Sequence, residues 1–369
     1  MKCSFNKSDI LNGINIVSKA VPVRTTMTIL ECILITADQE RICLTANDME
    51  LGIETEVAGF VETPGCLAID AKLFSEIIRK LPESLVTIDA DEDDHVEIRC
   101  EKSVFHISGK DGVEFPALPQ ISKDRSISLS QFTLKEMIRQ TIFSIAQSDS
   151  NKMMNGECLE VQGDHVRLTS LDGHRISLRS VMLGQSFQDE KVIIPGKTLS
   201  EVSKILTGDQ DSEVSLYFTS NTILFAFDQT IVVSRLVEGE YFRIDQMMTT
   251  DYEIKLQVSK KEMLECLERS LLLVRENDKK PLILDIRDDE MNLSMNSSIG
   301  ALQESIPIQK EGPDLMIAFN PRFMLDALRV IDEETVTLYM INSKAPCFIR
   351  DEEGSYIYLI LPVNFSTAR

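Results

Sequence analysis

A twelve-residue stretch occurs three times in this chain, at a constant spacing of 125 residues. The three copies are Asp70–Leu81, Pro195–Leu206 and Asn320–Ile331. A fixed period of this size in a chain of 369 residues indicates three copies of one domain-sized unit. The predicted domains cover residues 1–122, 127–246 and 252–369.

Each copy has the apolar spacing of an amphipathic helix. In the first copy, an apolar stripe with helical spacing comprises Leu73, Phe74, Ile77, Ile78 and Leu81. The opposite face carries two basic residues seven positions apart in every copy, with an acid between them. The basic pairs are Lys72 and Arg79, Lys197 and Lys204, and Arg322 and Arg329; the acids are Glu76, Glu201 and Asp326.

Two interpretations of this basic face stay open. It can be an ordinary solvated face whose charges form ion pairs along the helix. Alternatively, three basic faces in register form a surface for a repetitive anion, of which the DNA backbone is the obvious example. The net charge of −21 argues against nonspecific binding of nucleic acid by the whole surface. Any DNA-facing surface is therefore expected to be local, with the acids elsewhere.

Each repeat has the approximate element order β-α-β-β-β-α-β-β-β. The strands alternate apolar and polar residues, which is typical of antiparallel sheets with one face packed on helices. The sequence therefore predicts an α+β fold class, with two helices packed on antiparallel sheets in every repeat.

The composition indicates the cellular compartment in which we expect this protein. Eight scattered cysteines without a Cys-x-x-Cys pair favour reduced, mostly buried thiols in a cytoplasmic protein over a disulfide framework or a zinc site. The first residues form no apolar signal region. No apolar run approaches the length of about 18 residues that a membrane-spanning helix needs. We therefore expect a cytoplasmic protein without a membrane segment.

Motifs for catalysis or cofactor binding are weak. Asp172-Gly-His174 lacks a partner nucleophile at a recognisable spacing, so a turn histidine is the preferred interpretation. Pro195-Gly-Lys-Thr198 has Lys191 where a phosphate-binding loop needs glycine. The histidines are dispersed, so we expect no metal site and no cofactor.

Four local motifs resemble those of one known family, the bacterial DNA polymerase III β subunit, or sliding clamp. The most specific is Leu171-Asp-Gly-His-Arg-Ile176, which is similar to the family's Thr-Asp-Gly-His-Arg-Leu segment. The others are Arg24–Leu30, Val192–Lys197 and the C-terminal Leu361–Phe365. The resemblance covers essentially the whole chain.

The resemblance implies a fold and a function. Two copies of the chain would close head to tail into a ring of six clamp domains, with duplex DNA threading the hole without sequence preference. Such a homodimer is a non-catalytic processivity factor. It would tether the replicative polymerase catalytic subunit, and bind the clamp loader and repair and translesion proteins through short peptides. A protein-interaction scaffold of three repeats that does not encircle DNA is the alternative.

The resemblance and the internal repeat together imply three sets of site residues. The DNA-binding candidates are Arg24, Lys72, Arg79, Ser148, Lys152, Met153, Lys197, Lys204, Arg322 and Arg329. The partner-peptide pocket candidates are Leu171, Gly173, His174, Arg175, Ile176, Phe242, Met247, Pro346, Leu359, Leu361, Pro362, Val363 and Asn364. The dimer-interface candidates are Phe105, Ile107, Leu272 and Leu273.

Two of these sets have a structural alternative. Leu359, Leu361 and Val363 can instead belong to a buried final strand. The apolar residues of Val104–Ile107 and Leu271–Val274 can instead belong to the core of the monomer. An uncovered apolar strand edge is a liability, which favours an interface at Val104–Ile107.

Overall fold

The computed structural model describes residues 1–146, 151–275 and 280–365. It divides into two compact units, each assembled from two stretches of the chain. Unit 1 comprises Met1–Lys135 and Lys197–Leu236, and unit 2 comprises Glu136–Gly196 and Val237–Arg369. The middle repeat is therefore shared between the units, while the first repeat lies in unit 1 and the third in unit 2.

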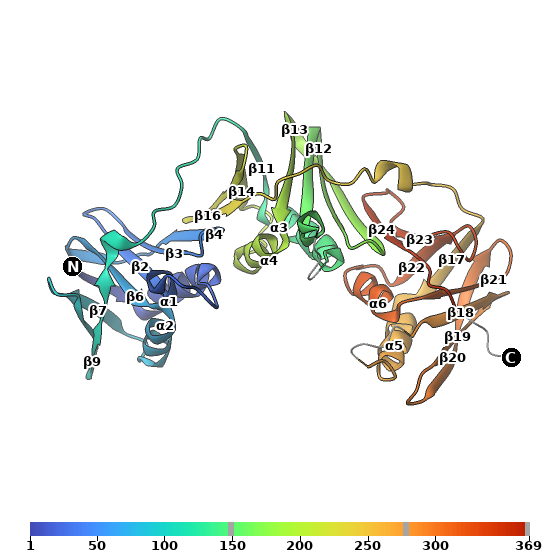
Figure 1. Cartoon of the computed structure of the whole chain (residues 1–369), viewed down its shortest axis with the longest axis horizontal. Helices are drawn as coiled ribbons and strands as arrows, with labels where there is room; N and C mark the ends of the chain where they lie inside the picture. The colour runs from blue at the N-terminus through green and yellow to red at the C-terminus, as the bar shows by residue number, and fades with distance from the viewer. Residues whose placement is uncertain (147–150, 276–279, 366–369) are drawn as a thin grey trace. The chain divides into compact units, whose positions relative to one another are not determined.

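Unit 1 contains two antiparallel sheets (Figure 1). The five-stranded sheet has the order β5 (Phe60–Thr63), β1 (Lys2–Asn6), β7 (Leu85–Ala90), β8 (His95–Cys100) and β9 (Ser103–Ser108). The nine-stranded sheet has the order β10 (Lys110–Asp111), β6 (Gly65–Asp70), β2 (Cys32–Ala37), β3 (Ile42–Asn47), β4 (Leu51–Glu56), β16 (Thr230–Arg235), β15 (Thr222–Phe227), β14 (Glu213–Phe218) and β11 (Ser126–Ser130).

Helices pack against the strands of unit 1. The α-helices that begin or lie in unit 1 are α1 (Lys7–Val17), α2 (Ala71–Lys80), α3 (Gln131–Thr141) and α4 (Gly196–Ile205). Short 3₁₀ helices cover Ser18–Ala20, Thr28–Glu31 and Gly112–Glu114. Helices α1 and α2 lie side by side and bury Ile10 and Ile14 from α1 and Phe74 and Ile78 from α2.

Unit 2 contains one ten-stranded antiparallel sheet. Its order is β12 (Gly156–Leu171), β13 (Arg175–Pro195), β24 (Tyr356–Ile360), β23 (Cys347–Arg350), β22 (Thr335–Met340), β17 (Ile254–Ser259), β20 (Ala301–Glu311), β19 (Glu290–Asn296), β18 (Leu282–Arg287) and β21 (Leu315–Phe319). Helices α5 (Lys260–Leu271) and α6 (Pro321–Arg329) lie side by side. Short 3₁₀ helices cover Ile142–Ser144, Lys152–Asn155 and Asp245–Met247.

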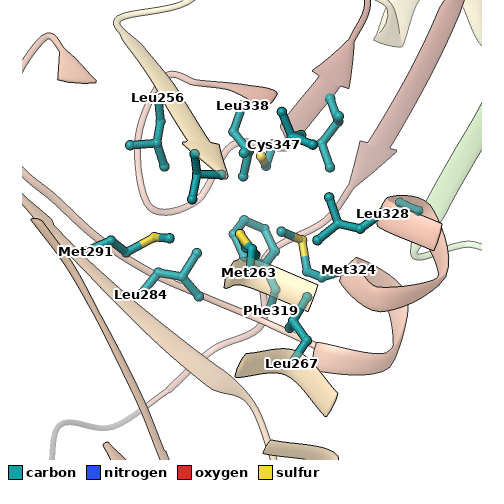
Figure 2. Packing of buried hydrophobic residues seen from close by; sticks show 14 of the residues in the cluster. Leu256, Met263, Leu267, Leu284, Met291, Phe319, Met324, Leu328, Leu338 and Cys347 are labelled. Atoms are coloured by element: carbon teal, nitrogen blue, oxygen red, sulfur yellow. The ribbon is translucent and has the colours of Figure 1, made fainter. Parts of the chain in front are cut away.

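The core of the third repeat shows how the helices and the sheet pack together. Figure 2 shows Met263 of α5, Met324 of α6 and Phe319 of β21 meeting among the strands. Met263 and Phe319 are completely buried, and Met324 is nearly so. Burying one such side chain stabilises the fold by roughly 1.5–3 kcal/mol, so this cluster holds the two helices on the sheet.

The repeated helices begin where their first residues predict. The side chain of Asp70 caps α2 by accepting a hydrogen bond from the N–H of Leu73 at 2.8 Å. Asn320 caps α6 in the same way by accepting from Arg322 at 3.0 Å, and Pro321 follows at the first helical position. Both arrangements satisfy backbone donors that have no partner inside a helix.

Two details of the first repeat differ from the prediction. The alternation of apolar residues over 51–61 predicts a single strand there, but the segment forms β4 and β5, which belong to different sheets. Leu73, predicted to lie on the apolar stripe of α2, is 42% exposed. The buried stripe of α2 is narrower and consists of Ala71, Phe74, Ile77 and Ile78.

The two units contain the same strand junction. In unit 1, β4 pairs with β16 and aligns Leu51 with Ser234. In unit 2, β13 pairs with β24 and aligns Ile176 with Leu359. Each residue of the second pair lies 125 positions after its counterpart in the first pair. The period of 125 residues therefore also applies to the strand pairing that joins one repeat to the next.

Candidate DNA-facing helices and partner groove

The repeated basic positions are exposed in all three copies. Lys72 and Arg79 lie on α2, Lys197 and Lys204 on α4, and Arg322 and Arg329 on α6. Arg24, in the loop before the 3₁₀ helix Thr28–Glu31, is exposed as well. The apolar stripe of each helix is turned toward its core, which places these cations on the solvent side.

The cations differ in how far they are already paired. Lys197 forms an ion pair with Asp48, and Lys204 pairs with Glu201 at 2.8 Å. Arg329 pairs with Glu268 at 3.0 Å. The cation of each pair is exposed and ion pairs open to water are weak, so an incoming phosphate can compete with the carboxylate.

Four of the cations have no carboxylate partner. Within the ranges that the structure describes, Arg24, Lys72, Arg79 and Arg322 form no ion pair; Arg79 donates only to the hydroxyl of Ser75, at 3.1 Å. The interpretation as a solvated face of intrahelical ion pairs therefore holds for Lys204 but not for Lys72 and Arg322. Unpaired, exposed cations are the ones that a phosphate can bind without first displacing a carboxylate.

A cavity of about 660 Å³ in unit 1 brings two of the predicted residues together. Arg79 of α2 and Lys204 of α4 both line it. The remaining charged residues of its lining are Asp9, Lys19, Glu56 and Asp228. Acids and bases are balanced there, so the cavity is not a concentrated anion site.

The loop candidates are only partly described. Ser148 lies outside the described residues. Lys152 is exposed at the start of the 3₁₀ helix Lys152–Asn155. Met153 is half-buried and packs against an apolar cluster of unit 2, so its position suits the partner groove better than a contact with DNA.

That apolar cluster contains much of the predicted partner groove. Its buried members include Leu171, Ile176 and Leu359, while Phe242 and Leu361 pack against it from the half-buried rim. The exposed groove candidates are Gly173, His174, Met247, Val363 and Asn364. Pro346 and Pro362 are half-buried. The structural alternative is therefore correct for Leu359, which is 1% exposed, and does not hold for Leu361 and Val363.

The segment 241–247, which leads from the second repeat to the third and contains two groove candidates, is held in place by charged and polar contacts. The hydroxyl of Tyr241 donates to the carbonyl oxygen of Thr169 at 3.3 Å, and its ring contacts that of Phe242. Asp245 forms an ion pair with Arg167 at 2.9 Å. Arg167 also pairs with Glu160. The segment before Met247 is therefore fixed against β12.

Arg175 differs from the other groove candidates because its side chain is only 8% exposed. Its guanidinium lies 3.0 Å from Asp172 and 2.8 Å from Asp326 of α6. Burial opposes the charge, but neighbouring Tyr358 and the two carboxylates outweigh it, and the pKa of Arg175 lies above its usual value. Arg175 therefore has a structural role beneath the groove.

Of the four predicted dimer-interface residues, two are exposed and two are half-buried. Strand β9 is the last strand of its sheet, and Phe105 is 38% exposed on it while Ile107 is half-buried. Leu272, just after α5, is 78% exposed. Leu273 is half-buried and lies 3.3 Å from the position that a Cβ on Gly300 would occupy, next to the start of β20. The alternative of a monomer core is therefore wrong for Phe105 and Leu272.

Sequence reasoning missed one buried polar residue. Glu157 of β12 is completely buried, and burial raises the pKa of its carboxyl to about 8. The nearby hydroxyl of Thr141 donates to the carbonyl of Met137 at 2.7 Å. Among the described residues, neither carboxylate oxygen of Glu157 has a hydrogen-bond partner. A single Glu in an otherwise ordinary strand carries no signal of this environment.

The described part of the chain contains no group of three or more His, Cys, Asp or Glu side chains arranged to hold a metal ion. Within the same part, no helix has the length and apolarity to cross a membrane.

Comparisons with known proteins agree on one family. Models of the DNA polymerase III beta subunit match the N-terminal domain at residues 1–119, the central domain at 128–243 and the C-terminal domain at 245–364. The beta sliding clamps of Staphylococcus epidermidis and Staphylococcus aureus are each 32% identical to this chain, over 99% of both chains.

Solved structures show the same relationship. The DNA polymerase sliding clamp from Bacillus subtilis is 32% identical, with a TM-score of 0.94 over 99% of this chain and 100% of its own. A chain from Eubacterium rectale, assigned to the DNA polymerase III beta subunit, is 56% identical with the same TM-score and coverage. With three repeated α+β domains matched over nearly its whole length, this chain belongs to the DNA polymerase III beta subunit family, the beta sliding clamps.

Proposed function

We propose that the chain acts as a non-catalytic processivity factor that closes around duplex DNA as a homodimer and tethers a replicative polymerase. The observation that carries this proposal is the exposed basic pair at equivalent positions of α2, α4 and α6, on a chain whose net charge is −21. Both basic positions recur in all three copies of this helix face. Phosphate contacts of this kind hold DNA without reading its sequence.

Ring closure is supported by the strand junction that the two units share. The counterpart of β4, two periods further along the chain, is Ala301–Ile306 of β20. That segment pairs with β19 on one side, while β17 pairs with β20 only from Ile308 onward. Its second edge is therefore unpaired within the described residues, and β9 likewise pairs only with β8.

The proposed dimer joins these two edges. Strand β9 of one chain pairs antiparallel with Ala301–Ile306 of a second chain, as β16 pairs with β4 and β24 with β13. Phe105 and Leu273 are then close to the same interface, because Leu273 lies beside the start of β20. Pairing both edges removes two open strand edges from solvent.

Partner proteins are proposed to dock at the groove whose rim is formed by Gly173, His174, Leu361 and Val363. Its floor is apolar, and its rim combines the exposed His174 with the apolar side chains of Leu361 and Val363, which suits a short peptide with a few apolar anchors. The chemical partners are the replicative polymerase catalytic subunit, the clamp loader, and repair and translesion proteins. We expect this assembly in the cytoplasm.

The experiment that tests the function is retention on nicked circular DNA. The protein is loaded with a clamp loader, free protein is removed, and half of the circles are cut once with a restriction enzyme. A topological clamp stays on circles and leaves cut DNA, because weak contacts cannot hold it on an open end. Equal retention on both, or none on either, would contradict encirclement and favour a scaffold.

A further inference from the structure

The acid between the two basic positions of each repeated helix is paired differently in the three copies. Glu201 of α4 pairs with Lys204 of its own helix at 2.8 Å. Glu76 of α2 is exposed and forms no ion pair within the described residues. Asp326 of α6 instead reaches Arg175, a residue of β13 that lies 151 positions earlier in the chain.

Arg175 is held by groups from three separate segments. Its Nη1 donates to Asp326 at 2.8 Å, and its Nη2 donates to the carbonyl oxygen of Phe143 at 2.5 Å. The guanidinium also lies 4.2 Å from the ring centroid of Phe323, which is on α6. A planar guanidinium with several fixed acceptors has one preferred orientation. Asp326 supplies the charged acceptor from the DNA-facing helix.

The same guanidinium fixes the turn at the exposed edge of the groove. Its Nε donates to Asp172 at 3.0 Å. The other oxygen of Asp172 accepts from the N–H groups of His174 and Arg175 at 3.0 and 3.2 Å. The carbonyl oxygen of His174 then accepts from the N–H of Leu361 at 2.9 Å. Consecutive hydrogen bonds thus run from α6 to both sides of the groove.

We propose that Asp326 is a positioning residue for the partner groove: through Arg175 it sets the turn Asp172–His174 and the backbone of Leu361, and so controls peptide affinity. This inference rests on the proposed docking of partner peptides at that groove. Arg175 acts beneath the peptide rather than as its contact. The helix that carries Arg322 and Arg329 toward DNA therefore also determines the shape of the partner site.

Removing the carboxylate charge has a physical consequence at Arg175. Asn in place of Asp326 leaves a buried guanidinium with one charged partner, Asp172, instead of two. A buried charge that loses a partner is strongly unfavourable, and the guanidinium shifts toward its remaining acceptors, Asp172 and the carbonyl of Phe143. The shift moves Asp172 away from the geometry in which it accepts from His174 and Arg175, and the hydrogen bond between Leu361 and His174 weakens.

The test compares Asp326→Asn with Asp326→Glu and with Glu201→Gln, the matched charge removal at the same position of α4. Calorimetry on the full-length protein measures the affinity of a synthetic peptide that carries a polymerase clamp-binding motif. We expect Asp326→Asn to weaken binding about tenfold, an effect of the size expected when one buried pair is disrupted. Asp326→Glu restores most of the affinity, and Glu201→Gln leaves it unchanged.

A separate control distinguishes positioning from loss of stability. Ile35→Val removes a methylene from the buried core of unit 1 and destabilises the fold without touching the groove. Affinity lost in Asp326→Asn but kept in Ile35→Val supports positioning. Wild-type affinity in Asp326→Asn, or an equal loss in both variants, overturns it.

Hydrogen exchange tests the same connection without any peptide. In the free protein, the amide hydrogen of Leu361 is expected to exchange about tenfold faster in Asp326→Asn than in the wild type or in Glu201→Gln. Unchanged exchange overturns the inference. If the wild-type protein binds no peptide but exchange responds, the docking function fails while the positioning role of Asp326 stands.

Discussion

Asp48, in the turn between β3 and β4, holds the ammonium group of Lys197, the first basic residue of α4. The carboxylate of Asp48 is only 9% exposed, whereas Lys197 is 58% exposed. The equivalent residues Lys72 and Arg322 form no ion pair in the part of the chain that the structure describes. Three positions that look alike in the sequence therefore differ in how readily they can meet a phosphate.

Charge removal at these three positions should weaken DNA binding without unfolding the protein. The variant Lys72→Gln/Lys197→Gln/Arg322→Gln loses exposed cations, and fewer counterions are then released from DNA on binding. We expect lower affinity for a short duplex and a shallower dependence of log K on log salt concentration, measured by fluorescence anisotropy. Lys255→Gln, on a sheet strand, is the control. An unchanged salt dependence in the triple variant would contradict a DNA-facing role.

Releasing Lys197 should have the opposite effect. Asp48→Asn keeps the side-chain oxygen that accepts from the N–H groups of Glu50 and Leu51, so the turn is preserved while the ion pair is lost. We expect DNA affinity to rise about twofold, as for a weak pair broken at the surface. The effect should vanish in a Lys197→Gln background. If the rise persists there, Asp48 acts by another route.

Introducing a charge on the edge strand should separate the proposed dimer. Phe105→Asp places a carboxylate where β9 would be covered by the second chain, and desolvating an unpaired charge is unfavourable. The dimer dissociation constant should rise by at least about tenfold, which corresponds to 1.4 kcal/mol, in sedimentation equilibrium. Met182→Asp, at a site that is 70% exposed, is the matched control. Equal association of all three proteins would place the interface elsewhere.

Glu157 should make stability depend on pH. Its pKa is about 8 in the folded protein and close to 4.3 when unfolded. As pH rises between these values, the unfolded chain releases the proton while the folded chain keeps it, so the free energy of unfolding decreases. Above about pH 8 the decrease stops. The total loss is at most on the order of 4–5 kcal/mol.

Glu157→Gln should remove this decrease. Urea denaturation from pH 5 to 8.5 should show the variant gaining stability over the wild type as pH rises through the window. Glu92→Gln, in the exposed acidic turn before β8, should follow the wild-type curve. A parallel pH dependence in the wild type and Glu157→Gln would mean that the buried carboxyl finds a partner and ionises normally.

Replacing Gly52 of β4 should disturb the packing of Leu118, which lies near the end of the first repeat. A Cβ added at Gly52 would lie 2.2 Å from Cδ2 of Leu118, so Gly52→Ala must displace this half-buried side chain. We expect a loss of about 1 kcal/mol in unfolding free energy, and partial recovery in Gly52→Ala/Leu118→Ala. Gly184→Ala, where an added Cβ meets nothing within 4 Å, should be neutral. Additive effects of Gly52→Ala and Leu118→Ala would rule out the contact.

Much of the fold follows from the sequence because its signals are periodic. The 125-residue spacing and the helical stripes of Asp70–Leu81 and Asn320–Ile331 predict the repeats and place helices α2 and α6 within a residue or two. The boundary between β4 and β5 could not be predicted in this way, because the alternation of apolar residues continues through Val57. The chain changes sheets at Gly59, where a side chain would meet Phe5 and the carbonyl of Ser4.

The sequence predicts site residues only where they belong to a local motif or to the internal repeat. The motif Leu171–Ile176 predicts the partner groove, but nothing nearby in the sequence shows that Arg175 is buried or that its partner is Asp326. The pairing of Lys197 with Asp48 likewise joins residues 149 positions apart. Such pairs depend on the tertiary packing of the repeats and leave no trace in the spacing of either residue.

The shared register of β4·β16 and β13·β24 has a consequence for assembly. A head-to-tail contact joins two unlike edges, so the contact itself does not limit how many copies assemble. The assembly closes into a ring only if the rotation between successive copies divides a full turn. Small changes in the angle between successive repeats would therefore turn a closed assembly into an open, growing filament. In the proposed dimer, closure would depend on the angle between successive repeats as well as on the strength of each strand pairing.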